Sequence, residues 1–372
     1  MSGTVHERDV RYLRVAQVVA TDAFAGAERY ATSLAIGLSR LGADAALVGG
    51  SAPGVRTAIV DAGAHLAHFP AAGLSSAWSQ LRKLGPLDIV HAHLTTAEVA
   101  ATLAFPTRSR AAVVSTRHIA ARRGSSLAGR MAAPFVRARL DGQLAPSTHV
   151  AERVDGTCIV IPTGVEDSEL GAHDEPIVMV VQRLEFEKDT ETALLAWAAS
   201  GLASRGWELH VTGTGSQEAA LRDLARQLEI QGSCRFLGHV NDVPRRLARA
   251  SVMLATAPAE AFGLAVAEAM ACGLPVVAAA AGGHLETLGP VEGAALFEPG
   301  DHEAAAALLR RFAEDASGRA TYGARLLARQ RSEYSLDGFV NRVATWYLDV
   351  LSGRGYSSLA GRAASSEARF EA

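Results

Sequence analysis

Short apolar runs alternate with longer stretches of helical spacing along the first half of the chain. The run LRVAQVVA at 13–20 stops at polar Thr21 and Asp22, and residues 27–41 then follow helical spacing. Further predicted strands lie at 44–49, 57–60, 87–93, 112–116, 142–145 and 158–161. Strands that alternate with helices favour right-handed crossovers and a parallel sheet. The first half is therefore predicted to be a doubly wound α/β domain.

A turn-rich stretch separates a second series of strands and helices from the first. IPTGVE at 161–166 closes the first series, and the polar segment GAHDEP at 171–176 is the expected hinge. The second series has predicted strands at 177–182, 207–212, 234–237, 252–255, 275–279 and 294–297. We therefore expect an α/β protein whose two Rossmann-like, doubly wound domains face a central cleft.

The expected domain boundaries follow from these two series. A chain of 372 residues is longer than one core usually needs, and we place the N-terminal domain at 1–168 and the C-terminal domain at 169–334. A helix at 335–351 is expected to pack back on the N-terminal domain. Residues 352–372 are rich in Ser, Gly, Ala and Arg, so they are expected to form a disordered tail.

Composition and charge are those of an ordinary globular protein. Hydrophobic residues make up 49% of the chain and the net charge is -3, so it lacks the positive charge with which nucleic-acid-binding proteins neutralise phosphates. Cys158, Cys234 and Cys272 are far apart, which predicts neither a disulfide framework nor a zinc site. No apolar run reaches about 18 residues. Because the N-terminus is also charged, we expect a cytoplasmic protein.

The stretch 256–286 carries the clearest candidate chemistry. Glu260 precedes an Ala-rich helix predicted to start near Gly263, and Glu268 lies in its following turns. Glu260 is thus expected in a strand-to-helix loop at the carboxyl edge of a parallel sheet, where open α/β folds bind ligands. Gly263 would let an anion approach the first helical amides, which favour phosphate. Two solvent-exposed glutamates near a helix start are the alternative reading.

A second loop of the same domain adds two cations. QRLEFEK at 182–188 follows a predicted strand and places Arg183 and Lys188 on the next strand-to-helix loop. Arg offers a planar fork to phosphate oxygens, and Lys offers a compact charge. Together with carboxylates suited to sugar and ribose hydroxyls, these cations indicate a site for a nucleoside-diphosphate sugar.

Several segments in a fixed order resemble the retaining family 4 glycosyltransferases of the GT-B fold. They are AGAERYATSLA near the N-terminus, IPTGVE, RLEFEK, TGTGSQEAALRDLA, FLGHV, EAFGLAVAE and GGHLE. The resemblance covers most of residues 13–345 and is more specific than any single motif. It implies that Arg183 and Lys188 bind the donor diphosphate, that Glu268 holds the ribose hydroxyls and that Glu260 lies beside the donor sugar. Further donor contacts are implied for Phe262, Gly263, Leu264, Gly213 and Val240, with the nucleobase near His239 and Val240.

Histidines mark the expected acceptor side of the N-terminal domain. His91 and His93 end one predicted strand, and His118 follows the next. A structural role is the alternative for each, but the resemblance places His118 beside the reacting sugar. Gly26 belongs to the N-terminal loop, where Ala25 stands in place of the first glycine of a usual Gly-Gly pair. That change could alter how the loop meets phosphate or acceptor.

Other departures from the family pattern lie in the C-terminal domain. Thr256, Ala257 and Ala261 stand where Pro, Ser and Pro are common, and these changes are expected to matter little. No H-x-x-H or Asp-x-Asp arrangement suggests a metal, so cationic side chains and helix dipoles are expected to act in its place. The predicted site therefore uses no metal and no cofactor besides the nucleoside-diphosphate sugar.

An arginine-rich block covers residues 108–153. It holds nine arginines against Asp141 and Glu152, and around 125–140 it mixes apolar and Arg positions as an interfacial helix does. One interpretation is peripheral contact with the inner face of an anionic cytoplasmic membrane, or with an anionic or lipid-linked acceptor. A solvated charged face and a soluble acceptor are the competing interpretations.

The expected function is a retaining glycosyltransferase of the hexosyltransferase type. Its acceptor hydroxyl would belong to a cell-envelope glycan, a glycolipid or a specialised metabolite. A nucleotide-sugar epimerase of GT-B architecture and a non-catalytic nucleotide-sugar binding protein remain as alternatives. A nicotinamide dehydrogenase is disfavoured, because GTGSQE has Glu218 where the third glycine of a dinucleotide fingerprint belongs.

Overall fold

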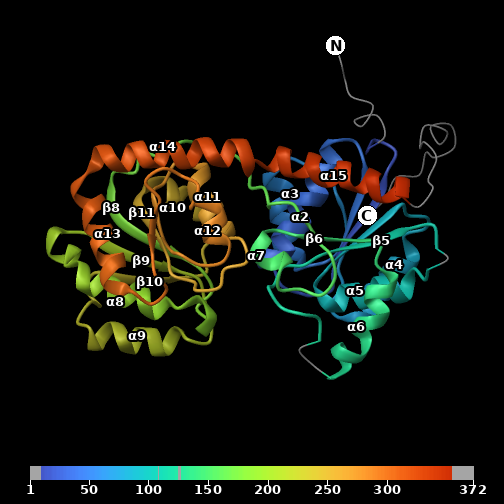
Figure 1. Cartoon of the computed structure of the whole chain (residues 1–372), viewed down its shortest axis with the longest axis horizontal. Coiled ribbons are helices and arrows are strands. Elements are labelled where there is room, and N and C mark those ends of the chain that lie inside the picture. The colour runs from blue at the N-terminus through green and yellow to red at the C-terminus, as the bar shows by residue number, and fades with distance from the viewer. Residues whose placement is uncertain (1–9, 108, 125–126, 354–372) are drawn as a thin grey trace, which may run out of the picture. The chain divides into compact units, whose positions relative to one another are not determined.

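The computed structural model describes residues 10–107, 109–124 and 127–353. Most of the predicted tail, residues 354–372, lies outside these ranges. The described chain divides into two compact units (Figure 1): unit 1 holds residues 10–163 and 336–353, and unit 2 holds residues 164–335. The chain thus leaves unit 1 after Thr163 and returns to it at Leu336.

Unit 1 is built on a parallel sheet with the strand order β3-β2-β1-β4-β5-β6-β7. Its strands are β1 (Arg14–Val19), β2 (Asp44–Gly49), β3 (Ala67–Phe69), β4 (Ile89–His93), β5 (Ala112–Thr116), β6 (Gly142–Ala145) and β7 (Ile159–Val160). Its helices are α2 (Gly26–Arg40), α3 (Ala52–Asp61), α4 (Leu74–Lys83), α5 (Leu94–Ala104), α6 (Leu127–Arg139), α7 (Thr148–Ala151) and α15 (Leu336–Gly353). The order reverses between β1 and β4, which is the point where such sheets bind ligands.

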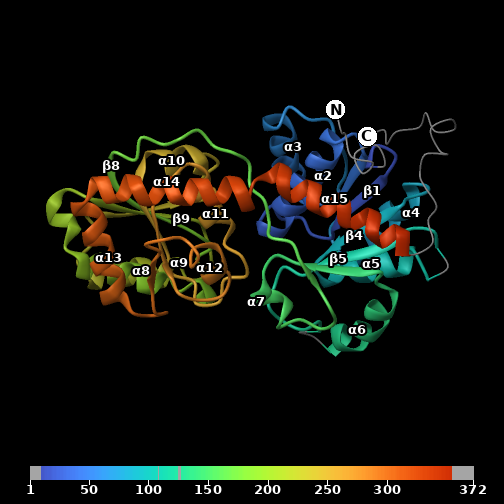
Figure 2. The same cartoon turned by 45° about the horizontal axis from the view of Figure 1, so that its top comes forward.

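Helices cover both faces of the unit 1 sheet, which explains its continuous apolar runs. Val15 and Ile89 pack in a cluster with α2 and α15, whereas Val18 and Val90 pack in a cluster with α4 and α5. Figure 2 shows α15 lying beside α2. Gly37 of α2 makes this approach close, because a Cβ there would lie 2.4 Å from Val340 Cγ2. The last described helix is therefore part of the unit 1 core.

Unit 2 repeats this plan with the strand order β10-β9-β8-β11-β12-β13, again all parallel. Its strands are β8 (Glu175–Val181), β9 (Glu208–Thr212), β10 (Cys234–Gly238), β11 (Ala250–Ala255), β12 (Val276–Ala279) and β13 (Ala295–Phe297). Its helices are α8 (Thr190–Ser200), α9 (Glu218–Gln227), α10 (Val243–Arg249), α11 (Leu264–Ala271), α12 (Gly283–Thr287), α13 (His302–Glu314) and α14 (Ala316–Glu333). The order reverses between β8 and β11.

Two local predictions were wrong. Residues 57–60 lie in α3, because Val55 and Ile59, four positions apart, pack on one side of a helix against Phe24. The strand that pairs with β2 is β3 instead. The expected hinge at 171–176 is held inside unit 2, since the His173 ring bonds the carbonyls of Ala250 and Cys272 at 2.9 and 2.8 Å.

Candidate active site

The loops that follow β8 and β11 lie beside each other at the reversal point of the unit 2 sheet. Lys188 ends a short 3₁₀ turn in the first loop, and Glu260 lies in the second. Lys188 Nζ donates to Glu260 Oε2 over 2.6 Å. Both side chains are largely buried, with 19% and 18% exposure. Two residues that the sequence places 72 positions apart therefore form one ion pair where the fold favours a ligand.

The charge state of Glu260 follows from its surroundings. Burial raises the pKa of its carboxyl, but Lys188 and the backbone N–H of Ala261 outweigh that effect and hold the pKa below its usual value. Glu260 is therefore a carboxylate at neutral pH. The loops after β8 and β11 thus bring an anion and a cation, both largely buried, into direct contact.

Two side chains without a predicted role in the site fix the backbone of Lys188. Gln182 Nε2 and the Thr256 hydroxyl both donate to the Lys188 carbonyl, at 3.0 and 3.1 Å. Asp189 follows with a φ of 48° and caps the N-terminus of α8, where its carboxylate accepts from Thr192 N. The structure thus gives Thr256 a contact with the Lys188 backbone that a proline at this position could not make.

Gly282 and Gly283 pack against the backbone of the loop that carries Glu260. Gly283 N donates to the Glu260 carbonyl over 2.8 Å. A Cβ at Gly282 would lie 2.3 Å from that same carbonyl oxygen, and one at Gly283 would lie 2.6 Å from Phe262 Cα. The GGHLE segment is therefore glycine-rich because the loop carrying Glu260 packs directly on it.

The residues predicted to contact donor sugar and phosphate surround the start of α11. Gly263 has a φ of 95° and precedes Leu264, the first residue of the helix. Phe262 is buried with its ring 5.5 Å from that of Tyr334. Glu268 lies on the same helix and is half-buried. The helix α11 thus begins four residues after Glu260, close to the start near Gly263 that the sequence predicts.

Arg183 lies in the same loop as Lys188 but is placed differently. Its side chain is 59% exposed and bonds Glu187, which is also exposed, over 2.6 Å. Among the described residues, Arg183 makes no hydrogen bond or ion pair with Lys188 or Glu260. The structure therefore brings only one of the two predicted cations to Glu260.

Gly213 and Val240 follow the neighbouring strands β9 and β10. Gly213 has a φ of 127°, and a Cβ there would lie 1.9 Å from the Gln182 carbonyl oxygen, so only glycine allows this approach. Its N–H bonds the Gly238 carbonyl at 2.9 Å. Val240 is half-buried and His239 is exposed. These loops stand next to the loop carrying Lys188, on the side of β8 opposite to β11.

In unit 1 the predicted acceptor-side residues follow β1, β4 and β5. Gly26 is exposed and begins α2, whose start is fixed by Glu28: the carboxylate accepts from the Thr21 hydroxyl at 2.6 Å and from Ala25 N at 3.0 Å. His93 ends β4 and is fully buried, while His118 follows β5 and is half-buried. These positions lie at and beside the reversal point of the sheet.

His93 and His118 belong to a longer row of hydrogen-bonded side chains, which we call the histidine chain. Its members are Gln17, His91, His93, Thr116, His118 and Tyr347. His118 Nε2 lies 3.0 Å from His93 Nδ1, and His93 Nε2 lies 2.9 Å from Gln17 Oε1. Gln17 Nε2 donates to the Tyr347 hydroxyl over 2.9 Å.

The second half of the histidine chain runs from Tyr347 to Thr116. The Tyr347 hydroxyl lies 2.6 Å from His91 Nδ1, and His91 Nε2 lies 2.7 Å from the Thr116 hydroxyl. Tyr30 packs edge-on against His118 with ring centroids 4.8 Å apart. Gln17 and Tyr347 are 330 positions apart in the sequence, so local patterns gave no signal for this arrangement.

Burial keeps these histidines neutral. It lowers the pKa of His91 to about 3, with a smaller effect from His118, and it lowers the pKa of His118 to about 4, helped by the Arg117 charge. The pKa of His93 is also well below its usual value, because of burial and the two neighbouring rings.

These depressed pKa values predict a loss of stability in mild acid. Below about pH 6.5 these three histidines bind protons in the unfolded chain but stay neutral in the folded chain. The free energy of unfolding should therefore fall as the pH is lowered. His91 alone should contribute a loss of about 2 kcal/mol between pH 7 and pH 5. Urea unfolding at both pH values measures this loss, and His91→Gln should reduce it. Equal stability of the wild type at both values would contradict the prediction.

A buried ion cluster lies beside His118 in unit 1. Arg123 donates to Glu98 through Nε and Nη2, each at 2.7 Å, and to Asp155 through Nη1 at 2.8 Å. Arg117 Nη1 lies 3.3 Å from Glu98, and the Ser115 hydroxyl also donates to that carboxylate. Burial raises the pKa of Glu98, but the two arginines and the serine reverse the effect and hold it below its usual value. The cluster is formed by Glu98, Arg117, Arg123 and Asp155, with two charges of each sign.

The arginine-rich block is therefore not one charged surface. Arg117, Arg123 and Arg139 are buried, and Arg139 bonds Asp141 at 2.7 Å. Arg122, Arg130 and Arg137 are exposed, while Arg108 lies outside the described residues. Counting charges along the sequence did not separate these two groups.

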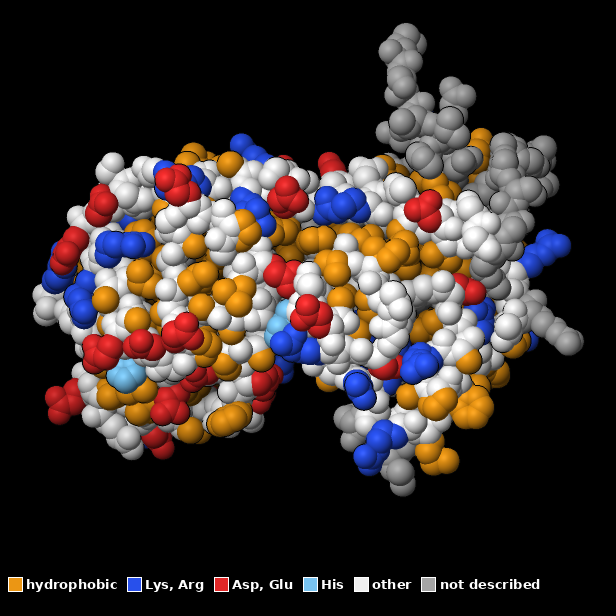
Figure 3. All heavy atoms as spheres, viewed as in Figure 1, with side chains coloured by type: hydrophobic (Ala, Val, Ile, Leu, Met, Phe, Trp, Pro, Cys, Tyr) orange, Lys and Arg blue, Asp and Glu red, His pale blue; other side chains and the backbone are white. Residues whose placement is uncertain are grey.

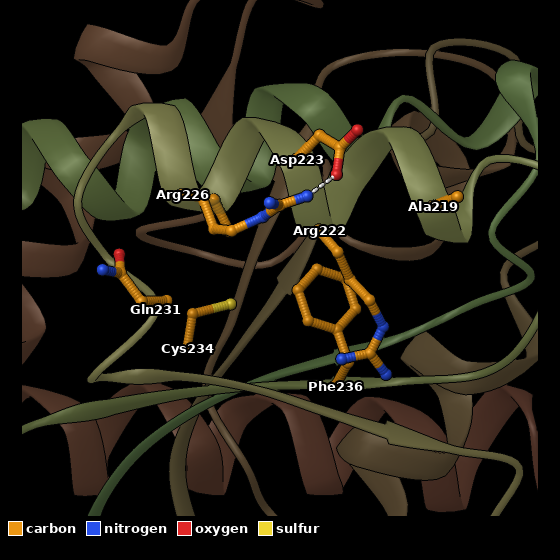
Figure 4. Close-up of a pocket in the computed structure, with 8 residues that line it drawn as sticks. Ala219, Arg222, Asp223, Arg226, Gln231, Cys234 and Phe236 are labelled. Carbon is orange, nitrogen blue, oxygen red and sulfur yellow. Dashed lines mark hydrogen bonds and ion pairs between the residues drawn. The ribbon is translucent and has the colours of Figure 1, made fainter.

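A surface pocket of about 480 Å³ lies on unit 2 between α9 and β10 (Figure 4). The Arg222 guanidinium lies 4.7 Å from the centroid of the Phe236 ring, Arg226 pairs with Asp223, and Cys234 also lines the pocket. None of the predicted donor-site residues lines it. The pocket is therefore separate from the loops predicted to bind the donor.

Within residues 10–107, 109–124 and 127–353, no group of three or more His, Cys, Asp or Glu side chains is arranged to hold a metal ion. In the same ranges, no helix combines the length and the apolar character needed to cross a bilayer.

Comparison with known families assigns the class of protein. The sequence model of Glycosyltransferase Family 4 matches residues 24–169, and that of Glycosyl transferases group 1 matches residues 165–326. The fold is GT-B. The first of these family models matches unit 1 and the second matches unit 2, and each unit contains one parallel sheet. The chain belongs to the family 4 glycosyltransferases.

Among curated relatives, the chain is 29% identical over 144 residues to N-acetyl-alpha-D-glucosaminyl L-malate synthase of Bacillus anthracis, covering 39% of this chain and 38% of that protein. It is 30% identical over 169 residues to the GDP-mannose-dependent monoacylated alpha-(1-6)-phosphatidylinositol monomannoside mannosyltransferase of Corynebacterium glutamicum, covering 43% of this chain and 44% of that protein. The alignments thus span less than half of these relatives.

Solved structures match over nearly the whole chain. HepE of Anabaena in complex with UDP-glucose has a TM-score of 0.75 at 19% identity, covering 91% of this chain and 99% of that one. Sucrose-phosphate synthase of Thermosynechococcus elongatus has a TM-score of 0.72 at 18% identity, with coverage of 91% and 99%. At these identities the likeness establishes the fold.

Proposed function

We propose that this protein transfers a hexose from a nucleoside-diphosphate sugar to an acceptor hydroxyl, with retention of configuration and without a metal ion. The observation that carries the proposal is the buried pair of Lys188 and Glu260 at the reversal point of the unit 2 sheet, next to the start of α11. A relative named for a GDP-mannose donor and a neighbour holding UDP-glucose support a donor of this class.

In the proposed reaction Lys188 and the first amides of α11 bind the diphosphate and stabilise its growing negative charge. The bond between the sugar C1 and the phosphate oxygen breaks, and a bond from C1 to the acceptor oxygen forms on the same face. The acceptor proton passes to the leaving phosphate oxygen. Glu260, an anion at neutral pH, stabilises the positive charge that develops on the sugar. Glu268 binds the ribose hydroxyls of the donor. His118 lies beside the reacting sugar on the acceptor side.

The test uses UDP-, GDP- and ADP-sugars with a panel of hydroxyl acceptors. A transferase releases nucleoside diphosphate in step with the glycosylated product, and the anomeric coupling in that product reports retention. Formation of an epimeric donor without acceptor would instead identify an epimerase. Donor binding with no turnover on any acceptor would favour the non-catalytic alternative.

We also propose that unit 1 contacts an anionic membrane that presents a lipid-linked acceptor. On α6, Met131 and Phe135 are one turn apart and are 69% and 75% exposed, and exposed Arg130 and Arg137 lie on the same helix. Figure 3 shows hydrophobic and basic side chains together on the part of unit 1 that contains α6. Exposed apolar groups beside cations suit an anionic lipid surface.

Sedimentation with liposomes of rising anionic lipid content tests this contact. Changing Arg122, Arg130 and Arg137 to Gln should weaken binding at low salt by about 1 kcal/mol per residue, and high salt should have the same effect. The matched control changes three exposed unit 2 arginines, Arg205, Arg226 and Arg245, to Gln. Equal pelleting of both variants, or none with the wild type, would favour a soluble acceptor.

A further inference from the structure

The histidine chain has an order of donors and acceptors that can be worked out atom by atom. A neutral imidazole has one N–H donor and one bare acceptor nitrogen. Because Gln17 Oε1 can only accept, the proton of His93 lies on Nε2 and its Nδ1 is bare. His93 Nδ1 is 3.0 Å from His118 Nε2, so the proton of His118 lies on Nε2. The free nitrogen of His118 is therefore Nδ1.

The other half of the chain is consistent with the same orientation of the Gln17 amide. Gln17 Nε2 donates to the Tyr347 oxygen, which leaves the hydroxyl proton for His91 Nδ1. His91 Nε2–H then donates to the Thr116 hydroxyl. Turning the Gln17 amide over would reverse every proton in the chain. The tautomer of His118 is thus coupled to one amide and one phenol.

We propose that Gln17 and Tyr347 are positioning residues that hold His118 with a proton on Nε2, so that its bare Nδ1 accepts a hydrogen bond from a sugar hydroxyl. The inference rests on the proposed function, because it deepens the role given there to His118. Among the described residues, none forms a hydrogen bond with His118 Nδ1, while Tyr30 packs against the ring and His93 fixes its other nitrogen. Tyr347 lies on α15, so the last described helix tunes an acceptor-side residue.

The direct test is the position of the ring proton, which long-range ¹H–¹⁵N NMR spectra report without any substrate. The wild type should show His118 protonated on Nε2 and bare on Nδ1. Gln17→Met and Tyr347→Phe should each give a mixture of the two tautomers. Tyr322→Phe is the matched control: it removes a buried hydroxyl bonded to Val276 O and Ala295 N in unit 2, and it should leave the His118 signals unchanged.

Kinetics provide the second measurement. Gln17→Met and Tyr347→Phe should lower kcat by roughly tenfold, the factor that corresponds to one lost hydrogen bond, while donor affinity stays unchanged. An unchanged His118 tautomer in both variants, in protein that remains folded, would overturn the positioning proposal. If the tautomer shifts as expected but His118→Ala turns over like the wild type, the role of His118 in the proposed function fails instead.

Discussion

Glu98→Ala should lower the free energy of unfolding by about 3–5 kcal/mol, because the substitution leaves two arginines in a buried cluster with only one carboxylate. Arg117 and Arg123 are 7% and 5% exposed, so water cannot replace the lost partner. Urea or thermal unfolding of the full chain measures the change. Since the two arginines flank His118 in the chain, the same substitution should also lower turnover.

An exposed ion pair provides the control for this prediction. Arg205 and Glu314 lie 3.0 Å apart with side chains 45% and 61% exposed. Glu314→Ala removes the same kind of partner and should cost about 1 kcal/mol or less. A Glu98→Ala loss as small as the Glu314→Ala loss would show that the buried cluster does not stabilise unit 1.

Lys188→Ala should weaken binding of nucleoside diphosphates by about 1.5–3 kcal/mol, because a charged hydrogen bond in a largely buried site is lost. Arg183→Ala should cost less than Lys188→Ala, about 1 kcal/mol or less, since the Arg183 side chain is exposed and already paired with Glu187. Calorimetry with UDP, GDP and ADP measures both effects. Unchanged affinities in Lys188→Ala would contradict the proposed phosphate site.

Glu260→Gln separates binding from chemistry in the same site. It keeps the size of the side chain but removes the negative charge beside Lys188. We expect kcat to fall strongly while diphosphate affinity stays equal or improves, because Lys188 loses a competing anion. Equal loss of donor affinity and kcat would assign Glu260 to binding instead.

The alternation of strands and helices was enough to predict two doubly wound units, because each unit buries both faces of its sheet. It was also enough to place Lys188 and Glu260 on adjacent loops. Their direct contact was not predicted, since pattern gives the edge of a sheet on which a loop lies but not the direction of its side chains. The prediction of a strand at 57–60 was wrong, because β-branched residues also occur on the buried face of a helix.

Polar contacts between residues far apart in the chain could not be predicted from the sequence. The pairing of Arg117 and Arg123 with Glu98 depends on burial, and the composition of the segment gives only the excess of positive charge. Thr256 shows the same limit within the site, because its hydroxyl bonds a carbonyl 68 positions away.

The return of α15 to unit 1 imposes an order of folding during synthesis. Unit 2 is one continuous segment, residues 164–335, and has all its core residues once that segment has left the ribosome. Unit 1 leaves the ribosome first, yet its core lacks Phe339 and Tyr347 until nearly the whole described chain is made. The first unit synthesised is therefore the last to be completed, and until then the apolar face of α2 that packs on α15 stays uncovered and open to chaperones.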